Sequence, residues 1–272
     1  MTYQPDSSGI NSLSGFSFQI KVFVYYMLML EEGMQIEFET LEDVNIKNIE
    51  NGKIDQKSEN FISKLLTINS NIAIQVKRTG ITNAVAQQVL LNWILLESSE
   101  NNISKYLLFT DSEYDNKDII FKKSATELFD IIVDSDKQKN ATISKVKKLY
   151  KDKYTDFEKI YEEIKRKYTF KSIGCIDKQI DDGCSVHFRK LANKVVYNQR
   201  LKELLQHITV QIMEAVDKRR PYVIGYEEFI KLIEDISCRL TEEITAPLYS
   251  NFKKIAQNGS HAFAIRYGVN FS

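Results

Sequence analysis

Hydrophobic and polar residues alternate with strand periodicity in "MQIEFETLEDVNI", residues 34–46. Successive residues of a strand point to opposite faces of a sheet, so every second side chain shares a face. One face collects Ile36, Phe38, Val44 and Ile46, and the other collects Glu37, Glu39, Leu41 and Asp43. The pattern predicts an amphipathic strand with carboxylates on its second face.

Two further strands are predicted in "NIAIQVK", residues 71–77, and in the apolar run "KYLLFTD", residues 105–111. Between them, "NAVAQQVLLNWILLES", residues 83–98, repeats its apolar residues at helical spacing. Strands that alternate with a helix in this way indicate an α/β core.

The most apolar segment is "FSFQIKVFVYYMLML", residues 16–30. It is shorter than the roughly 20 residues that span a bilayer and contains two polar side chains, so it is interpreted as a core helix. Ser12 or Ser14 is expected to cap this helix, which should run to about residue 32 and end at Gly33.

From about residue 123 onward the pattern becomes helical, and it includes a Lys-rich stretch and "GYEEFIKLIEDISCRL" near the end. A boundary near residue 140 is therefore expected. Residues 1–140 should form an α/β domain with a mixed central sheet flanked by helices. Residues 141–272 should form a mainly helical domain for interaction or oligomerisation.

Composition narrows the class of protein. The chain has 37 basic and 37 acidic residues among 272, so no global field draws it to nucleic acid or to an anionic membrane, and any polyanion site must be local. Three cysteines are an odd and sparse set, which argues against a disulfide framework and for a reducing compartment such as the cytoplasm.

Candidate chemistry lies on the predicted strand pair. Gln75 and Lys77 project to the same side of one strand, and Glu39 and Asp43 share a side of the preceding strand. If these strands pair, a carboxylate, an amide and an ammonium converge. Oxygen ligands of this kind suit Mg²⁺, and a nearby lysine can orient a water molecule and balance charge on phosphorus. The alternative is a solvated sheet face with an ordinary salt bridge.

The same residues resemble the PD-(D/E)XK nuclease superfamily in its Gln-x-Lys variant, and in particular the Cap-type endonuclease domain of bacterial anti-phage systems. That domain has a Gly-x-x-x-Gln helix, an acid-acid-aliphatic strand and a Gln-x-Lys strand. The corresponding residues here are Gly15 and Gln19, then Glu42-Asp43-Val44, then Gln75-Val76-Lys77. The resemblance covers about residues 8–112 and implies a restriction-endonuclease-like core.

The resemblance also implies roles for single residues. Asp43 would be the main metal carboxylate, Gln75 the second ligand and Lys77 the catalytic lysine. Glu39 would add a water-mediated metal contact. The supporting positions would be Gln19 in the first helix and Gln87 or Gln88 in the later one, and Asp55 competes with Asp43 for the principal metal role.

Three basic side chains are candidates for contacting the phosphate backbone. Arg78 follows the candidate lysine directly, and phosphate contacts position nucleic acid without reading its sequence. Lys147 and Lys151 lie in the Lys-rich stretch, which also fits a solvated helix face because acids alternate with its lysines.

The resemblance extends more loosely to the nuclease subunit of Lamassu-type (ABC-three-component) defence systems. It implies a DNA endonuclease dependent on Mg²⁺, with Mn²⁺ as the alternative, acting on double-stranded DNA with little sequence preference. Such an effector is expected in the bacterial cytoplasm, with no membrane partner, held inactive by an SMC-like ATPase and a further small subunit, and active as a homo-oligomer. Two alternatives remain open: a degenerate interaction subunit that docks the ATPase, and a ribonuclease.

Overall fold

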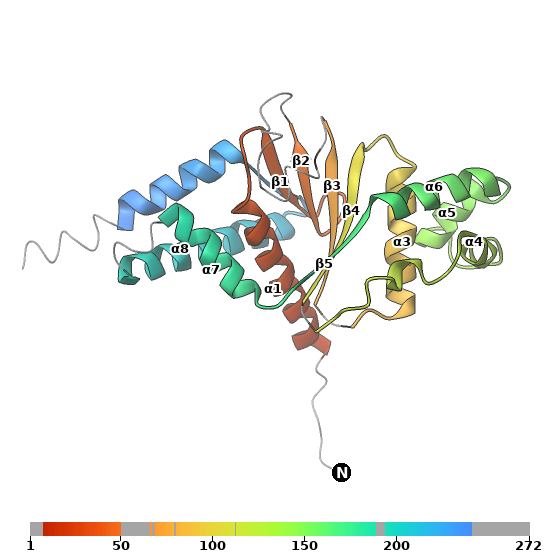
Figure 1. Ribbon diagram of the computed structural model, residues 1–272, viewed down its shortest axis with the longest axis horizontal. Helices are drawn as coiled ribbons and strands as arrows, with labels where there is room; N and C mark the ends of the chain where they lie inside the picture. Colours follow the sequence, from red (N-terminus) through yellow and green to blue (C-terminus); the bar gives the residue numbers. More distant parts are fainter. Residues whose placement is uncertain are drawn as a thin grey trace, which may run out of the picture.

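One mixed sheet lies between two layers of helices in the computed structural model, which describes residues 8–49, 66, 69–78, 80–111, 113–188 and 194–240 (Figure 1). Six strands of these residues form the sheet in the order β5-β4-β3-β2-β1-β6. The helices of the first layer are α1 (Ser8–Met27), α7 (Ile176–Phe188) and α8 (Lys194–Asp217). Those of the second are α3 (Asn83–Glu97), α4 (Ala125–Val133), α5 (Thr142–Tyr150) and α6 (Tyr154–Lys167). The expected fold class, an α/β sheet flanked by helices with a helical C-terminal region, is confirmed.

The sheet combines an antiparallel half with a parallel half. The antiparallel strands are β6 (Tyr222–Gly225), β1 (Met34–Phe38), β2 (Val44–Asn48) and β3 (Asn71–Lys77). The strands parallel to β3 are β4 (Ile103–Asp111) and β5 (Tyr168–Ile173). A short 3₁₀ helix, η1 (Ile119–Phe121), follows β4. The strands expected at 71–77 and 105–111 and the helix expected at 83–98 are confirmed.

The first helix differs from its prediction at both ends. It already includes residue 8 and ends at Met27, five residues before the expected end. The next residues form tighter turns, in which the Leu30 amide donates to the Met27 carbonyl at 3.1 Å. Gly33 has a φ of 84°, so it occupies the left-handed region in the turn before β1 rather than capping the helix.

The single strand predicted over residues 34–46 is wrong. These residues form an antiparallel hairpin, in which Phe38 of β1 pairs with Val44 of β2. Glu39 has a φ of 57°, which turns the chain, and its amide donates to the Asp43 carbonyl at 3.2 Å. Asp43 therefore lies in the hairpin loop and not within a strand. The alternation predicted one strand because Val44 and Ile46, after the chain has reversed, point to the same core as Ile36 and Phe38.

Two strands in the C-terminal half were not predicted. β5 directly follows α6, and β6 lies in the segment that was expected to be a connector before the last helix. That last helix is present at residues 226–240. The domain boundary near residue 140 stays a prediction, but strands from beyond it form both edges of the sheet.

The hydrophobic core consists of two clusters, one on each face of the sheet. Strand β3 contributes to both, because its alternate side chains point in opposite directions. Ile72, Ile74 and Val76 pack with α1, α7 and α8, whereas Ala73 packs with the helices around α3. By the same alternation, Gln75 and Lys77 lie on the α3 side. Among the described helices, none is long and apolar enough to cross a bilayer.

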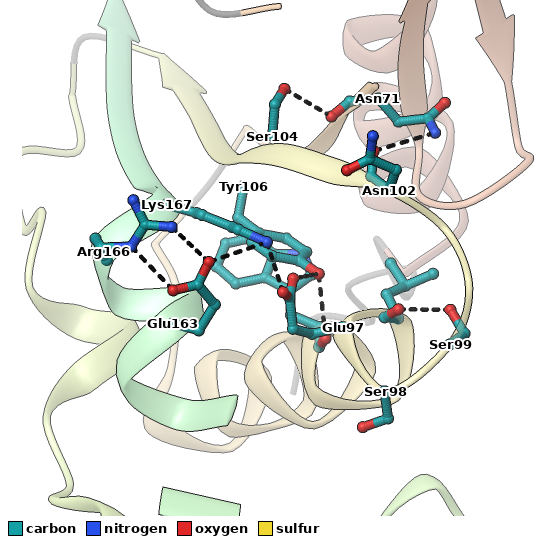
Figure 2. Close-up of polar contacts among 12 residues, drawn as sticks. Asn71, Glu97, Ser98, Ser99, Asn102, Ser104, Tyr106, Glu163, Arg166 and Lys167 are labelled. Carbon is teal, nitrogen blue, oxygen red and sulfur yellow. Dashed lines mark hydrogen bonds and ion pairs between the residues drawn. The ribbon is translucent and has the colours of Figure 1, made fainter. Parts of the chain in front are cut away.

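A polar cluster fixes the end of α3 to its neighbours (Figure 2). Glu97 accepts a hydrogen bond from the Tyr106 hydroxyl of β4 at 2.8 Å and pairs with the Lys167 ammonium of α6 at 2.5 Å. Lys167 also lies 3.3 Å from Glu163, which Arg166 binds through its guanidinium. Glu97 and Lys167 are both largely buried, at 11% and 16% side-chain exposure. This cluster holds α3 at a fixed position over the sheet.

Candidate active site

The candidate site lies at the carboxyl end of β3, where the parallel strand β4 also ends. Register pairs Gln75 with Leu108 and Lys77 with Thr110 near these ends. In open α/β sheets, ligands bind outside the carboxyl ends of parallel strands, where loops rather than helices cover the backbone. Gln75 is buried, with 4% of its surface exposed, and Lys77 is half-buried at the strand end.

Asp43 is held at this end by the backbone and side chains of β3. Its Oδ2 accepts a hydrogen bond from the Val76 amide at 2.7 Å and another from the Gln75 side-chain amide. The Lys77 ammonium lies 4.0 Å from the same oxygen. Backbone pairing between β2 and β3 begins at Val44 with Ile74. Beyond this pair, the Val76 amide of β3 donates to the Asp43 carboxylate instead of to a backbone carbonyl of β2. The structure brings Asp43, Gln75 and Lys77 together, as the sequence predicted.

Gln19 reaches the same carboxylate from the opposite helical layer. It lies on α1, and its side chain hydrogen-bonds to Asp43. Asp43 is therefore held from both faces of the sheet, by Gln19 from the α1 side and by Gln75 from the α3 side. The supporting position expected for Gln19 is thus adjacent to the predicted metal carboxylate.

Three acids of the hairpin loop are crowded at this point, and their pKa values are raised. Burial is the main cause for Asp43, although Lys77 and the hydrogen bonds oppose the increase. Burial and the Asp43 charge raise the pKa of Glu39. The pKa of Glu42 is raised to about 8, mainly by burial and then by the Asp43 charge. Burial and mutual repulsion thus favour the neutral forms of these carboxyl groups.

Glu42 is the residue of this site that sequence reasoning left without a role. Its Oε1 is shielded from solvent and forms no hydrogen bond of normal geometry, although the nearby Trp93 indole N–H lowers the pKa of the carboxyl. A buried carboxylate oxygen without a donor is costly, and such atoms are rare in folded proteins. The only sequence signal was the position of Glu42 beside Asp43 in the acid-acid-aliphatic motif. Its burial arises from the hairpin loop, which the strand pattern did not predict.

A cleft of about 400 Å³ opens in front of these side chains. The loop acids, Gln75 and Lys77 line one wall, and α3 lines the other through residues that include Gln88 and Asn92. Gln87 lines a separate pocket together with Asn83, so of the two glutamines that the sequence left open, Gln88 is the one that lines the cleft, and the supporting role stays a prediction. Neighbouring helix positions point about 100° apart, which is why only one of the two glutamines faces the cleft. Gln88 also donates to Asn92 at 3.0 Å and to Thr142 of α5 at 2.7 Å.

The predicted phosphate-binding residues occupy different places. Arg78 is exposed beside Lys77 and donates to the Ser14 hydroxyl of α1. Lys147 donates to the Ser135 carbonyl at 2.9 Å, and neither it nor Lys151 lines the cleft. Asp55, the competing metal carboxylate, falls outside the described residues.

The donor set of the cleft fits a hard divalent cation in its chemistry. Carboxylate and amide oxygens are the ligands that Mg²⁺ takes, and a bound cation would favour the charged forms of Asp43 and Glu39, whose pKa values are raised without it. In the described part of the chain, however, no three His, Cys, Asp or Glu side chains are grouped so that they could hold a metal ion together. Binding would therefore require the Gln75 amide, water or substrate oxygens to complete the set.

Comparisons of the chain with family models, with curated proteins and with solved structures found no match. The chemistry of the cleft is therefore inferred from the residues and geometry of this chain.

Proposed function

We propose that this chain is a metal-dependent endodeoxyribonuclease that hydrolyses phosphodiester bonds with little sequence preference. The observation that supports this most is the placement of Lys77 4.0 Å from Asp43 and beside Gln75, at the floor of an open cleft. A lysine and a carboxylate at one strand end provide a group that stabilises charge on phosphorus and a group that takes up a cation.

Each side chain of the site has a distinct role in the proposed reaction. The Lys77 ammonium donates hydrogen bonds to the attacking water or to a phosphoryl oxygen and offsets the negative charge that develops as the water oxygen bonds to phosphorus. The Val76 amide and Gln75 hold the Asp43 carboxylate in one orientation. The bond from phosphorus to the leaving oxygen breaks, the attacking water releases a proton to solvent, and the leaving oxygen takes up a proton from solvent to become a free hydroxyl.

Asp43 and Gln75 would hold Mg²⁺ or Mn²⁺, with Glu39 contributing through water. When bound, the cation polarises the phosphate and stabilises the leaving oxygen. Glu42 lines the same cleft, so the charge of a bound cation would favour its ionised form.

Cleavage of supercoiled and linear double-stranded DNA, with Mg²⁺ or with EDTA, tests the proposal directly. Wild type should cut only with the metal, and Lys77→Ala should lower the rate by about a thousandfold, because one preorganised charge-stabilising group contributes roughly 10²–10³. Lys105→Ala is the matched control, because Lys105 is a half-buried lysine of the neighbouring strand that does not line the cleft. Equal activity of folded Lys77→Ala and wild type would refute the role of Lys77.

A matched RNA duplex in the same assay separates the deoxyribonuclease from the ribonuclease alternative. The residues that line the cleft show no dedicated contact for a 2′-hydroxyl, so DNA is the proposed substrate. Preferential cutting of RNA would replace DNA with RNA as the substrate and retain the chemistry.

A second candidate function, an interaction subunit, is favoured by the surface of α8. Several apolar side chains along α8 are exposed, namely Val195, Val210, Met213 and Val216. Apolar groups gathered on one helix are typical of contact surfaces. Under this second function, the surface would dock the SMC-like ATPase, and the cleft would have no catalytic role. Absence of cleavage by wild type in every metal, with tight binding to a partner, would favour this function over the nuclease.

A further inference from the structure

A second groove, of about 780 Å³, reaches Lys77 from the other side. It runs between the first half of α1 and the end of β3. Its lining combines cationic, hydroxyl and apolar groups, among them Ser12, Leu13, Ser14, Gly15, Lys77 and Arg78. Gln19, which hydrogen-bonds to Asp43, also lines it. The groove and the cleft therefore meet at Lys77, which lines both.

The groove has a more positive lining than the cleft. In the cleft, Lys77 stands beside three acidic residues of the hairpin loop, whereas the described residues that line the groove include no acid. In the groove, the ammonium of Lys77 and the guanidinium of Arg78 are contributed by adjacent residues. Cationic side chains beside hydroxyl groups are typical of surfaces that follow a sugar–phosphate backbone, and apolar side chains can pack against sugars and bases.

Gly15 gives the groove its second distinctive feature. It is the eighth residue of α1, and glycine inside a helix costs about 1 kcal/mol relative to alanine. A Cβ built on Gly15 would meet no protein atom within 4 Å, so no packing contact within the protein requires glycine. A glycine at such a position allows close approach of another backbone to the helix.

We propose that this groove binds the sugar–phosphate backbone of the DNA strand next to the scissile phosphate, with Arg78 contacting a phosphate and Gly15 leaving room for the strand. The inference rests on the proposed nuclease function, because it assigns the path by which the substrate of that same site reaches Lys77. The strand would pass along α1, cross Lys77 and enter the acidic cleft at the position of attack.

Binding of a short fluorescein-labelled DNA duplex, measured by fluorescence anisotropy in EDTA, tests the groove without cleavage. Gly15→Leu places an apolar side chain in the groove and should weaken binding by about tenfold while keeping or raising the melting temperature, because leucine favours helix. Gly9→Leu is the matched control, because Gly9 also lies on α1 with nothing near its Cβ but does not line the groove. Arg78→Ala should weaken binding and lower the slope of log affinity against log salt by about 1.

The outcomes separate the groove from the nuclease. Loss of binding in Gly15→Leu and Arg78→Ala, with Gly9→Leu like wild type, supports the groove. If wild type cuts DNA and Gly15→Leu binds and cuts equally well, the groove inference is overturned and the nuclease stands. Equal losses in the two leucine variants would also overturn it, because the effect would belong to the helix as a whole. If wild type neither binds nor cuts DNA, the proposed function itself fails.

Discussion

At the scale of single residues, the hairpin loop concentrates acids that the fold does not neutralise. Glu42 is the extreme case, with a pKa of about 8 and an oxygen that forms no hydrogen bond of normal geometry. A raised carboxyl pKa means that the folded protein holds its proton more tightly than the unfolded chain does. The metal-free fold is therefore strained by this loop, and the strain depends on pH.

Replacing Glu42 with glutamine should remove the part of that pH dependence that Glu42 contributes. The contribution of Glu42 to the free energy of unfolding is greatest below the ordinary glutamate pKa. It falls by up to about 1.4 kcal/mol per pH unit as the pH rises and levels off above pH 8. Glu42→Gln should match wild type near the acid end and exceed its unfolding free energy in mildly alkaline buffer. Urea denaturation in EDTA, from acid to mildly alkaline pH, measures the free energy of unfolding of both proteins. Glu100→Gln, an exposed acid, serves as control, and parallel pH profiles for wild type and Glu42→Gln would contradict the expectation.

How far the sequence reveals the site depends on where each residue lies. Gln75 and Lys77 could be assigned to one face because both lie in a regular strand, where alternation fixes direction. The choice between Gln87 and Gln88 could not be made, because the pattern of α3 does not show which side meets the loop. Glu42 could not be identified as buried, because its environment depends on a turn with no Gly or Pro to mark it.

At the scale of elements, the clearest difference between sequence and structure is the hairpin of β1 and β2. Apolar residues before and after the turn share one core, so a reversal of direction leaves the alternation intact. β5 and β6 were missed for another reason. β5 is an edge strand with side chains mostly half-buried, and β6 has four residues, so neither carries a clear period-two pattern.

The cluster around Glu97 gives a prediction at this scale. Lys167→Met removes the partner of a buried carboxylate and should lower the free energy of unfolding by about 3 kcal/mol. Lys165→Met, which affects an exposed pair on the same helix, should cost about 0.5 kcal/mol or less. Chemical denaturation of wild type and both variants measures these losses of unfolding free energy. Similar small losses in the two variants would mean that α3 is held by its apolar packing alone.

At the scale of the whole molecule, the two halves of the chain share one sheet and two hydrophobic clusters. β5 and β6, both beyond residue 140, form the edges of the sheet. Ile208 and Phe229 lie in the cluster on the α1 side, and Phe157 and Tyr161 lie in the one on the α3 side. The described residues thus form a common core across the expected boundary.

A chain of residues 1–140 therefore tests the domain prediction. It would lack both edge strands, expose the edges of β4 and β1, and lose apolar partners in each cluster. We expect it to aggregate or to melt without a cooperative transition, whereas residues 8–240 should melt cooperatively. Calorimetry with circular dichroism compares the two. A cooperative transition in the shorter chain would establish the independent domain that the sequence predicted.

The double hold on Asp43 has a consequence for the safety of the cell. Its carboxylate is oriented by Gln19 from helix α1 and by Gln75 from strand β3 within the sheet. Under the proposed function, cutting requires α1 to be docked on the assembled sheet. A chain still emerging from the ribosome, or one nicked by a protease so that α1 loosens, would carry the chemical groups of a nuclease without their arrangement and would leave the genome intact.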